Sequence, residues 1–144
     1  MIAVDTNLLV YAHRRDSPWH DAAAAAIRSV AEGGTAWAIA WPCVHEFLAI
    51  VTHPRIYNPP STLAQAIKQV EAWLESPTLT LLAEADGYWD TLVATLKAGR
   101  IAGPQVHDAR VAALCRSHGV SALWTADRDF SRFPDLEVYN PLIA

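Results

Sequence analysis

The fold follows from one opening stretch, Ile2-Ala3-Val4-Asp5-Thr6-Asn7-Leu8-Leu9-Val10. Its first three residues are apolar and predict a short buried strand over residues 2–4. The apolar residues after Asn7 predict a helix whose cap would be Thr6 or Asn7. An acidic residue, Asp5, therefore stands at the junction between the first strand and the first helix.

Further strands and helices alternate along the rest of the chain. Apolar runs predict strands over residues 35–40, 79–82, 121–124 and 137–139. Capping residues, prolines and glycines predict helices from Ser17-Pro18 to Gly33, from Pro42 to Thr52, from a Ser61 cap to Glu75, from an Asp86 cap to Gly99, and from Gly103-Pro104 to a stop at Gly119. Residues 127–133 are expected to form a loop with one helical turn.

Strands that alternate with helices indicate an α/β fold, with a parallel sheet flanked by helices on both faces. No repeat or linker divides the sequence, so one domain over residues 1–144 is expected. Ligand sites in such sheets lie beyond the carboxyl ends of the strands. Functional residues are therefore expected just after strands and in the first turns of the helices that follow.

The composition predicts a folded domain that needs neither a disulfide nor a membrane. Hydrophobic residues make up 52% of the 144 residues and charged residues only 18%, which excludes an intrinsically disordered chain. No apolar run approaches the roughly 20 residues of a membrane span, and no secretory signal precedes Asp5. We therefore expect a soluble, cytoplasmic protein. Cys43 and Cys115 form no C-x-x-C pair and are expected to be buried free thiols.

Five acidic residues are expected near the functional edge of the sheet. Asp5 follows the first strand, and Asp127 and Asp129 follow the strand over residues 121–124. Glu46 and Asp108 fall in the opening turns of two helices that begin at the same edge. Helical spacing puts these two acids on faces with apolar residues, so both are expected to point towards the core.

Carboxylates that converge without matching bases repel one another, and oxygen ligands of this kind suit Mg²⁺ or Mn²⁺. We therefore interpret the group as a divalent-metal site. The charge balance agrees, because the chain has 15 acids and 11 bases, and removing Asp5, Glu46, Asp108 and Asp127 leaves 11 of each. Taken singly, Glu46 is explained equally well by the helix dipole, and Asp127 is better explained as a turn residue.

Basic residues recur close in sequence to these acids. Such side chains can hold a phosphate backbone, and ordinary solvated arginines are the alternative interpretation for part of the set. They are Arg14, Arg15, Arg55, Arg110, Arg128 and Arg132.

Other catalytic chemistries fit the sequence less well. Ala49 stands where a zinc-protease motif would need a second histidine. Asn7 stands where an aspartyl-phosphate phosphatase would need a second acid. Gly33-Gly34 lacks the G-K-[ST] that follows in a phosphate-binding loop. His45 and His107, each beside one of the acids, are interpreted as core or supporting residues rather than ligands.

Four segments carry most of these candidates: residues 4–12 (V-D-T-N-L-L-V-Y-A), 41–47 (W-P-C-V-H-E-F), 106–113 (V-H-D-A-R-V-A-A) and 124–130 (W-T-A-D-R-D-F). In this order they resemble the four motifs of PIN domains. The first motif alone is weak evidence, but the four together are specific. Length and motif spacing are similar to those of the VapC ribonuclease toxins of prokaryotic toxin–antitoxin pairs, and the resemblance covers essentially the whole chain.

The resemblance implies a Rossmann-like parallel sheet, an Mg²⁺- or Mn²⁺-dependent endoribonuclease, a homodimer, and inhibition by a cognate VapB-type antitoxin. It assigns the acidic quartet of the family to Asp5, Glu46, Asp108 and Asp127. In this interpretation Asp5, Asp108 and Asp127 hold the metal. Glu46 holds a second metal or orients the attacking water.

Other residues receive supporting roles from the same resemblance. Thr6 would place a hydroxyl near the metal, Asn7 would support the site, and Asp129 is an alternative to Asp127 as the fourth acid. The substrate would be single-stranded or looped RNA, from tRNA, rRNA or mRNA, because its phosphodiester can enter a carboxylate cleft. Candidate RNA contacts are Arg14, Arg15, Arg110, Arg128 and Arg132.

Two other functions are compatible with a PIN-like sequence. One is a non-catalytic module that binds RNA or protein, which would not need the complete acidic set. The other is a PIN nuclease that processes RNA or cuts DNA flaps outside a toxin–antitoxin pair, which would usually carry extra helices or domains for its structured substrate. A small upstream reading frame with a DNA-binding N-terminal half would favour the toxin.

Overall fold

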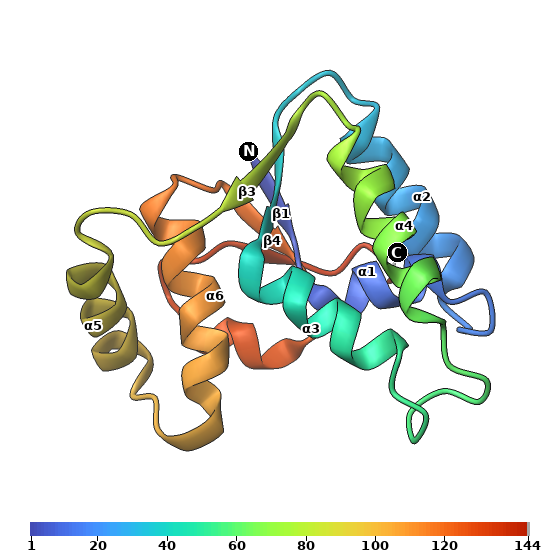
Figure 1. Ribbon diagram of the computed structural model, residues 1–144. Coiled ribbons are helices and arrows are strands. Elements are labelled where there is room, and N and C mark those ends of the chain that lie inside the picture. The colour runs from blue at the N-terminus through green and yellow to red at the C-terminus, as the bar shows by residue number, and fades with distance from the viewer. Residues whose placement is uncertain (144) are drawn as a thin grey trace.

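A computed structural model describes residues 1–143. Five strands form one parallel sheet in the order β3-β2-β1-β4-β5, which confirms the expected α/β class (Figure 1). The strands are β1 (Ile2–Val4), β2 (Trp37–Ala40), β3 (Leu79–Leu82), β4 (Ala122–Trp124) and β5 (Val138–Tyr139). All five lie within a few residues of the strands that the apolar runs predict.

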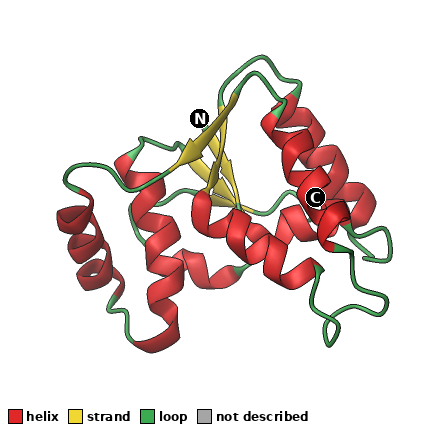
Figure 2. Ribbon diagram, in the orientation of Figure 1, coloured by secondary structure: helices red, strands yellow, loops and turns green. Residues whose placement is uncertain are grey.

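Six α-helices and two short 3-10 turns connect the strands (Figure 2). The α-helices are α1 (Thr6–His13), α2 (His20–Ala31), α3 (Trp41–Val51), α4 (Leu63–Leu74), α5 (Tyr88–Gly99) and α6 (Val106–Ser117). The 3-10 turns are η1 (Gly103–Gln105), directly before α6, and η2 (Arg128–Arg132), between β4 and β5. The single helical turn expected within residues 127–133 is η2, so that prediction is confirmed.

Helices cover both faces of the sheet, as expected. The chain moves outward from β1 to β2 and β3, then crosses β1 to reach β4 and β5. Right-handed crossovers place helices on opposite faces when the direction reverses in this way. Figure 1 accordingly shows α5 and α6 on one side of the sheet and α1, α2 and α4 on the other.

The core sits around the central strands, because their side chains are covered from both faces. All four residues of β2 are buried, and so are Ala3 and Val4 of β1. Cys43 and Cys115 are buried free thiols, as the sequence predicts. Among residues 1–143, no helix is long and apolar enough to cross a membrane.

Two predicted helix caps are wrong by one residue. Thr62, not Ser61, caps α4, because the Thr62 hydroxyl accepts a hydrogen bond from the Gln65 amide and the Gln65 side chain closes the capping box. Gly87, not Asp86, precedes α5 and has a φ of 83°, a left-handed conformation that glycine adopts without strain.

Two predicted helix starts also differ. Asp5 itself is the N-cap residue of α1, which begins at Thr6, so the predicted caps Thr6 and Asn7 are already helical. Helix α2 begins at His20 rather than at Ser17, because Ser17 forms a turn instead. Its hydroxyl and its carbonyl accept hydrogen bonds from the amides of Trp19 and His20.

The sheet order fixes where a ligand can bind. Connections leave β1 towards β2 on one side, whereas β4 joins β1 on the other, so the order reverses between β1 and β4. Such a reversal leaves a crevice beyond the carboxyl ends of the two strands. Asp5 directly follows β1 and Thr125 directly follows β4, so both lie at this crevice.

Candidate metal centre and active site

Asp5 is the most constrained acid at this edge of the sheet. Its side chain is buried, and its amide donates to the Trp124 carbonyl at 2.9 Å, which continues the pairing of β1 with β4. Three side chains donate to its carboxylate: the Thr125 hydroxyl at 2.8 Å, the Asn7 amide at 3.4 Å and the Cys43 thiol at 3.5 Å. These contacts hold the carboxylate in one orientation.

Burial raises the pKa of the Asp5 carboxyl to about 6, despite the hydrogen bonds from Thr125, from the Thr6 amide and from Cys43, which lower it. The nearby Glu46 carboxylate raises it further. A charged Asp5 is therefore held in the fold at a cost in free energy. A cation beside it would remove that cost.

Glu46 reaches the same place from α3. The Thr6 hydroxyl donates to its carboxylate at 3.3 Å, which links the beginning of α1 to α3. The expectation that Glu46 points into the core is wrong, because its side chain is exposed. The buried stripe of α3 runs through Cys43 and Phe47, and Glu46 lies on the edge of that stripe.

Asp108 comes from the first turn of α6 and is half-buried. Three residues of its predicted face, Val111, Ala112 and Cys115, are buried, so the acid does lie beside the core. Burial raises the pKa of the Asp108 carboxyl, and the acids Asp127, Asp129 and Glu46 raise it further. Repulsion between neighbouring carboxylates is therefore a physical feature of this site.

The fourth motif contributes two acids. Asp127 caps η2, and its carboxylate accepts a hydrogen bond from the Asp129 amide at 2.9 Å. Carboxylate oxygens of Asp108, Asp127 and Asp129 lie within 4.8 Å of one another. Asp127 faces a pocket that it shares with Asp108, whereas Asp129 is exposed and lies 3.8 Å from the guanidinium of Arg132.

This pocket, of about 160 Å³, gathers all four acids of the predicted quartet. We call it the acidic cleft; it is lined by Asp5, Thr6, Asn7, Glu46, Ile50, His107, Asp108, Val111, Asp127 and Phe130. His107 belongs to the lining, but His45 does not, and the His45 ring instead packs near the Trp41 ring. Within residues 1–143, no ion pair involves a member of the quartet.

Thr125 contacts the acids of this edge, and the charge pattern missed it. Its hydroxyl is buried and donates to Asp5, and it accepts hydrogen bonds from the Asn7 side chain at 3.1 Å and from the Asp127 amide at 3.0 Å. Asn7 completes the link, because its carbonyl oxygen accepts from the Ala126 amide at 3.1 Å. The only signal in the sequence was a hydroxyl residue directly after a strand.

The donor set fits a hard divalent cation. Every side chain that could act as a ligand, apart from His107, offers carboxylate, hydroxyl or amide oxygen, which is the preference of Mg²⁺ and Mn²⁺. The carboxylates of Asp108, Asp127 and Asp129 are close enough for a single ion to contact more than one of them. Arg132, beside Asp129, offsets part of the repulsion at Asp108, but neighbouring acids and burial still raise the pKa of that carboxyl, and a cation would relieve the repulsion that remains.

The predicted RNA-binding arginines do not lie together. Arg110 pairs with Glu84 at 3.4 Å, and Arg132 lies beside Asp129. Arg14 and Arg15 instead line an open groove of about 820 Å³ at the far end of α1, together with Arg28 and further residues of α2 and α4. We call this region the basic groove; its charged or ionisable lining residues are His13, Arg14, Arg15, Asp16, His20, Arg28 and Lys68.

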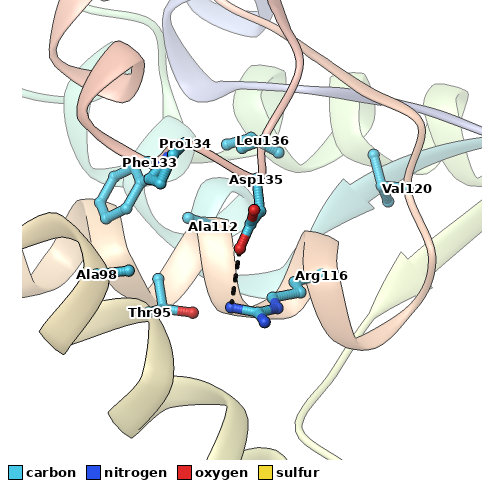
Figure 3. A pocket seen from close by; sticks show the side chains of 9 residues that line it. All are labelled: Thr95, Ala98, Ala112, Arg116, Val120, Phe133, Pro134, Asp135 and Leu136. Carbon is cyan, nitrogen blue, oxygen red and sulfur yellow. Dashed lines mark ion pairs between the residues drawn. The ribbon is translucent and has the colours of Figure 1, made fainter.

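A further small cavity lies between α5, α6 and the segment before β5 (Figure 3). Its volume is about 30 Å³, and Arg116 and Asp135 pair across one side of it at 3.6 Å. Thr95 and Phe133 are among its other lining residues. It shares no lining residue with the acidic cleft, and its size suits a packing gap better than a substrate site.

A model of the PIN domain family matches residues 2–136, a range that includes all four acids of the cleft. Ribonuclease VapC48 of Mycobacterium tuberculosis is 31% identical over 137 residues, covering 95% of this chain and 94% of that protein. Ribonuclease VapC33 of the same organism is 32% identical over 142 residues, covering 99% of both. The chain belongs to the VapC ribonucleases of the PIN-domain family.

A solved structure supports the VapC fold. It is that of VapBC2 from Rickettsia felis bound to a DNA fragment from their promoter, and its matching chain superposes with a TM-score of 0.70 at 19% identity. The match covers 97% of this chain and 98% of that chain. The five-stranded parallel sheet and its flanking helices are therefore those of VapC structures.

Proposed function

We infer that the acidic cleft is the catalytic centre of a divalent-metal-dependent endoribonuclease, and that the chain is the toxin of a VapBC pair. The activity follows from membership of the VapC ribonucleases. The location of the centre rests on one observation, which is that Asp5, Glu46, Asp108 and Asp127 line a single pocket. Each of these acids comes from a different segment, so the centre exists only in the folded chain.

Mg²⁺ or Mn²⁺ is the cation that we propose for this site. When bound, it would neutralise charge on the scissile phosphate and activate the attacking water. Asp5, Asp108 and Asp127 would hold it, and the exposed Glu46 would orient the water or hold a second ion. We prefer Asp127 to Asp129 as the fourth acid, because Asp127 lines the cleft.

Three uncharged side chains would position these acids. Thr125 and Asn7 fix the Asp5 carboxylate by donating hydrogen bonds to it, and Asn7 also ties α1 to the backbone after β4. Thr6 holds Glu46 through its hydroxyl. A fixed first ligand needs little reorganisation when the cation binds, which favours both metal affinity and catalysis.

RNA that is single-stranded or looped is the substrate class that we propose, whether it comes from tRNA, rRNA or mRNA. Strands of this kind can bend a phosphodiester into a small pocket and splay out the flanking bases. The exposed Arg128, next to Asp127, is the best placed of the predicted arginines to contact the strand, because Arg14, Arg110 and Arg132 already contact acidic side chains and Arg15 lines the basic groove at the other end of α1.

Metal removal and restoration test this function directly. The purified chain is stripped of metal with EDTA and incubated with total RNA, and the new RNA ends are sequenced. We expect no cleavage after stripping, and cleavage at defined positions after Mg²⁺ or Mn²⁺ is added back. Full cleavage by rigorously stripped protein would contradict the metal-dependent centre.

A VapB-type antitoxin is the partner that we propose, acting on a homodimer of this chain in the cytoplasm. Acids in the cleft have no paired base in residues 1–143, so a basic side chain of the antitoxin, most simply an arginine, can be held near the metal. Replacing each antitoxin arginine by alanine in the purified pair should release ribonuclease activity in one variant. Persistent inhibition by every variant would place the antitoxin contact elsewhere.

A further inference from the structure

A second hollow adjoins the acidic cleft on the side of β5. Its volume is about 360 Å³, and it lies between η2, β5 and the residues that follow β5. We call it the side pocket; the lining residues that matter here are Asp127, Arg128, Ser131, Val138, Asn140 and Ile143. Asp127 lines both the side pocket and the acidic cleft, so the two spaces share a wall.

The walls of the side pocket combine apolar surface with a few free polar groups. Val138 and the exposed Ile143 supply apolar surface. The Asn140 side-chain oxygen accepts a hydrogen bond from the Leu142 amide, which fixes the side chain and leaves its NH₂ group as a donor. In residues 1–143 the Ser131 hydroxyl makes no hydrogen bond, so it too can meet a ligand.

We propose that the side pocket binds the nucleobase next to the scissile phosphate of the RNA. The inference rests on the proposed function, since it takes the acidic cleft as the place where the phosphate is cut. When a phosphate lies beside Asp127 in the cleft, the nucleoside attached to it can reach the side pocket, which lies on the other side of Asp127. The two pockets meet at Asp127, so a phosphate in the cleft and its base in the side pocket can belong to one nucleotide.

The chemistry of the side pocket fits a base better than it fits a second phosphate. Asp127 would repel another phosphate, whereas the faces of a nucleobase pack against apolar side chains such as Val138 and Ile143. The amide of Asn140 and the hydroxyl of Ser131 can exchange hydrogen bonds with the edge of a base. Arg128 can contact the ribose-phosphate chain that leads out of the pocket. Asn140 and Ser131 are thus the residues that would select one base over another.

An abasic scan tests this inference by binding rather than by cleavage. Sequencing of RNA ends first maps a cleavage site of the wild-type protein. Short RNAs that contain this site, each with one abasic nucleotide, are then titrated against protein that carries Asp108→Asn, so that the RNA stays intact. We expect one abasic position, next to the scissile phosphate, to weaken binding about tenfold.

Filling the pocket should remove this effect. Ser131→Phe, added to the Asp108→Asn protein, places an aromatic ring in the space for the base, so the abasic and complete RNAs should then bind within about twofold of each other. Ser117→Phe is the matched control, because Ser117 is exposed at the far end of α6 from Asp108. That control should keep the tenfold effect.

A second variant keeps the test decisive if Ser131→Phe lowers the melting temperature. Asn140→Leu removes the free amide donor. RNAs that carry each of the four bases at the same position should then bind with more nearly equal affinity. Equal binding of all abasic RNAs, an abasic effect that survives Ser131→Phe, or an unchanged base preference in Asn140→Leu would each overturn the inference. Weaker binding of the antitoxin to Ser131→Phe, without any abasic effect, would assign the pocket to a protein partner instead.

Failure of the inference is separable from failure of the proposed function. If the wild-type protein cuts RNA in a metal-dependent way but no abasic position matters, only the side pocket is wrongly assigned. If the wild-type protein cuts no RNA, no cleavage site can be mapped, and the catalytic assignment of the cleft falls together with the side pocket that depends on it.

Discussion

The acidic cleft and the basic groove lie at opposite ends of α1. They differ in whether a central charged side chain has partners within the fold. In the groove, the guanidinium of Arg14 pairs with Asp16 at 2.6 Å, donates to the Pro59 carbonyl and lies 4.2 Å from the centre of the Tyr57 ring. In the cleft, four carboxylates meet without a paired base in the described chain. Arg14 is satisfied by partners within the fold, whereas the carboxylates of the cleft are not.

This difference separates structural charge from functional charge. A charge that is satisfied within the fold stabilises the fold, and its removal should lower the free energy of unfolding. A charge that is left unsatisfied costs stability until a ligand arrives, and its removal should abolish function while sparing or stabilising the metal-free fold. Substitutions and pH titrations at both ends of α1 test this contrast.

The largest expected effect belongs to Asp108→Asn. Removing one carboxylate from the cleft should lower the rate of RNA cleavage by about a hundredfold or more, because Asp108 is a proposed metal ligand and loss of a ligand costs at least as much as loss of a supporting residue. The same change removes repulsion with Asp127, Asp129 and Glu46, so thermal melts without metal should show equal or higher stability. Asp86→Asn, at an exposed acid outside the cleft, is the control. An unfolded Asp108→Asn protein would show instead that Asp108 is structural.

Thr125→Val should lower the cleavage rate by about ten- to a hundredfold without removing any charge. Valine keeps the shape of threonine but loses the hydroxyl that orients Asp5 and accepts from Asn7. A matched change, Thr91→Val on α5, also removes a hydroxyl hydrogen bond, but far from the cleft. Cleavage rates at saturating Mg²⁺ and at limiting Mg²⁺ distinguish poorer chemistry from weaker metal binding. A Thr125→Val rate equal to that of wild type would contradict the positioning role.

Acidification should stabilise the cleft end of the metal-free protein. The pKa of Asp5 is about 6 in the fold and about 4 in an unfolded chain. Between these values the folded state binds more protons than the unfolded state, so stability rises as the pH falls from 7 towards 4, by on the order of 2 kcal/mol. Denaturant unfolding of wild type and Asp5→Asn at several pH values isolates this contribution. A pH dependence that is identical in the two proteins would contradict it.

The groove end should respond to acid in the opposite direction. Burial lowers the pKa of His13, whose ring contacts Gln69 and Ser61. An unfolded chain then binds a proton at His13 more readily than the folded chain does, so stability from this residue is lost as the pH falls below its ordinary value. His13→Gln should lose that response, measured in the same unfolding series. Saturating Mg²⁺ should change the pH dependence of the free energy of unfolding that comes from Asp5. It should leave the pH dependence that comes from His13 unchanged.

The smallest effect is expected from Arg14→Ala. Loss of its contacts with Asp16, Pro59 and Tyr57 should lower the free energy of unfolding by about 1 kcal/mol, since the pair with Asp16 is partly exposed to solvent. Arg15→Ala, at the exposed neighbouring residue, should leave the melting temperature unchanged. Equal melting temperatures for both variants would show that the Arg14 charge is not structural.

The amino-acid sequence was sufficient for the fold and for the acids because both depend on periodicity and charge. Apolar runs mark the strands, and the carboxyl ends of parallel strands meet at one edge, so Asp5 and Asp127 could be placed together from the order of the residues alone. Thr125 could not be found in this way, because an uncharged hydroxyl after a strand is equally common as a simple turn residue.

Burial and caps were harder to predict for a different reason. Spacing along a helix gives the direction of each side chain but not the width of the buried stripe, so Glu46 was expected in the core although it lies at the edge of that stripe. At the start of α4, Ser61 and Thr62 are equally good caps by type. Gln65, three residues after Thr62, decides the choice, because it closes a capping box that Ala64 cannot close for Ser61.

The hydrogen bond between Asp5 and Thr125 joins residues 120 positions apart, and it has a consequence for protein synthesis. Ribosomes add about 5 to 20 residues per second, so about 6 to 24 seconds separate the synthesis of the two partners. During that interval β1 can pair with β2, but its other neighbour, β4, does not yet exist. A growing chain therefore cannot yet assemble the proposed nuclease centre, and a message broken before the codon for Thr125 yields a fragment that lacks it.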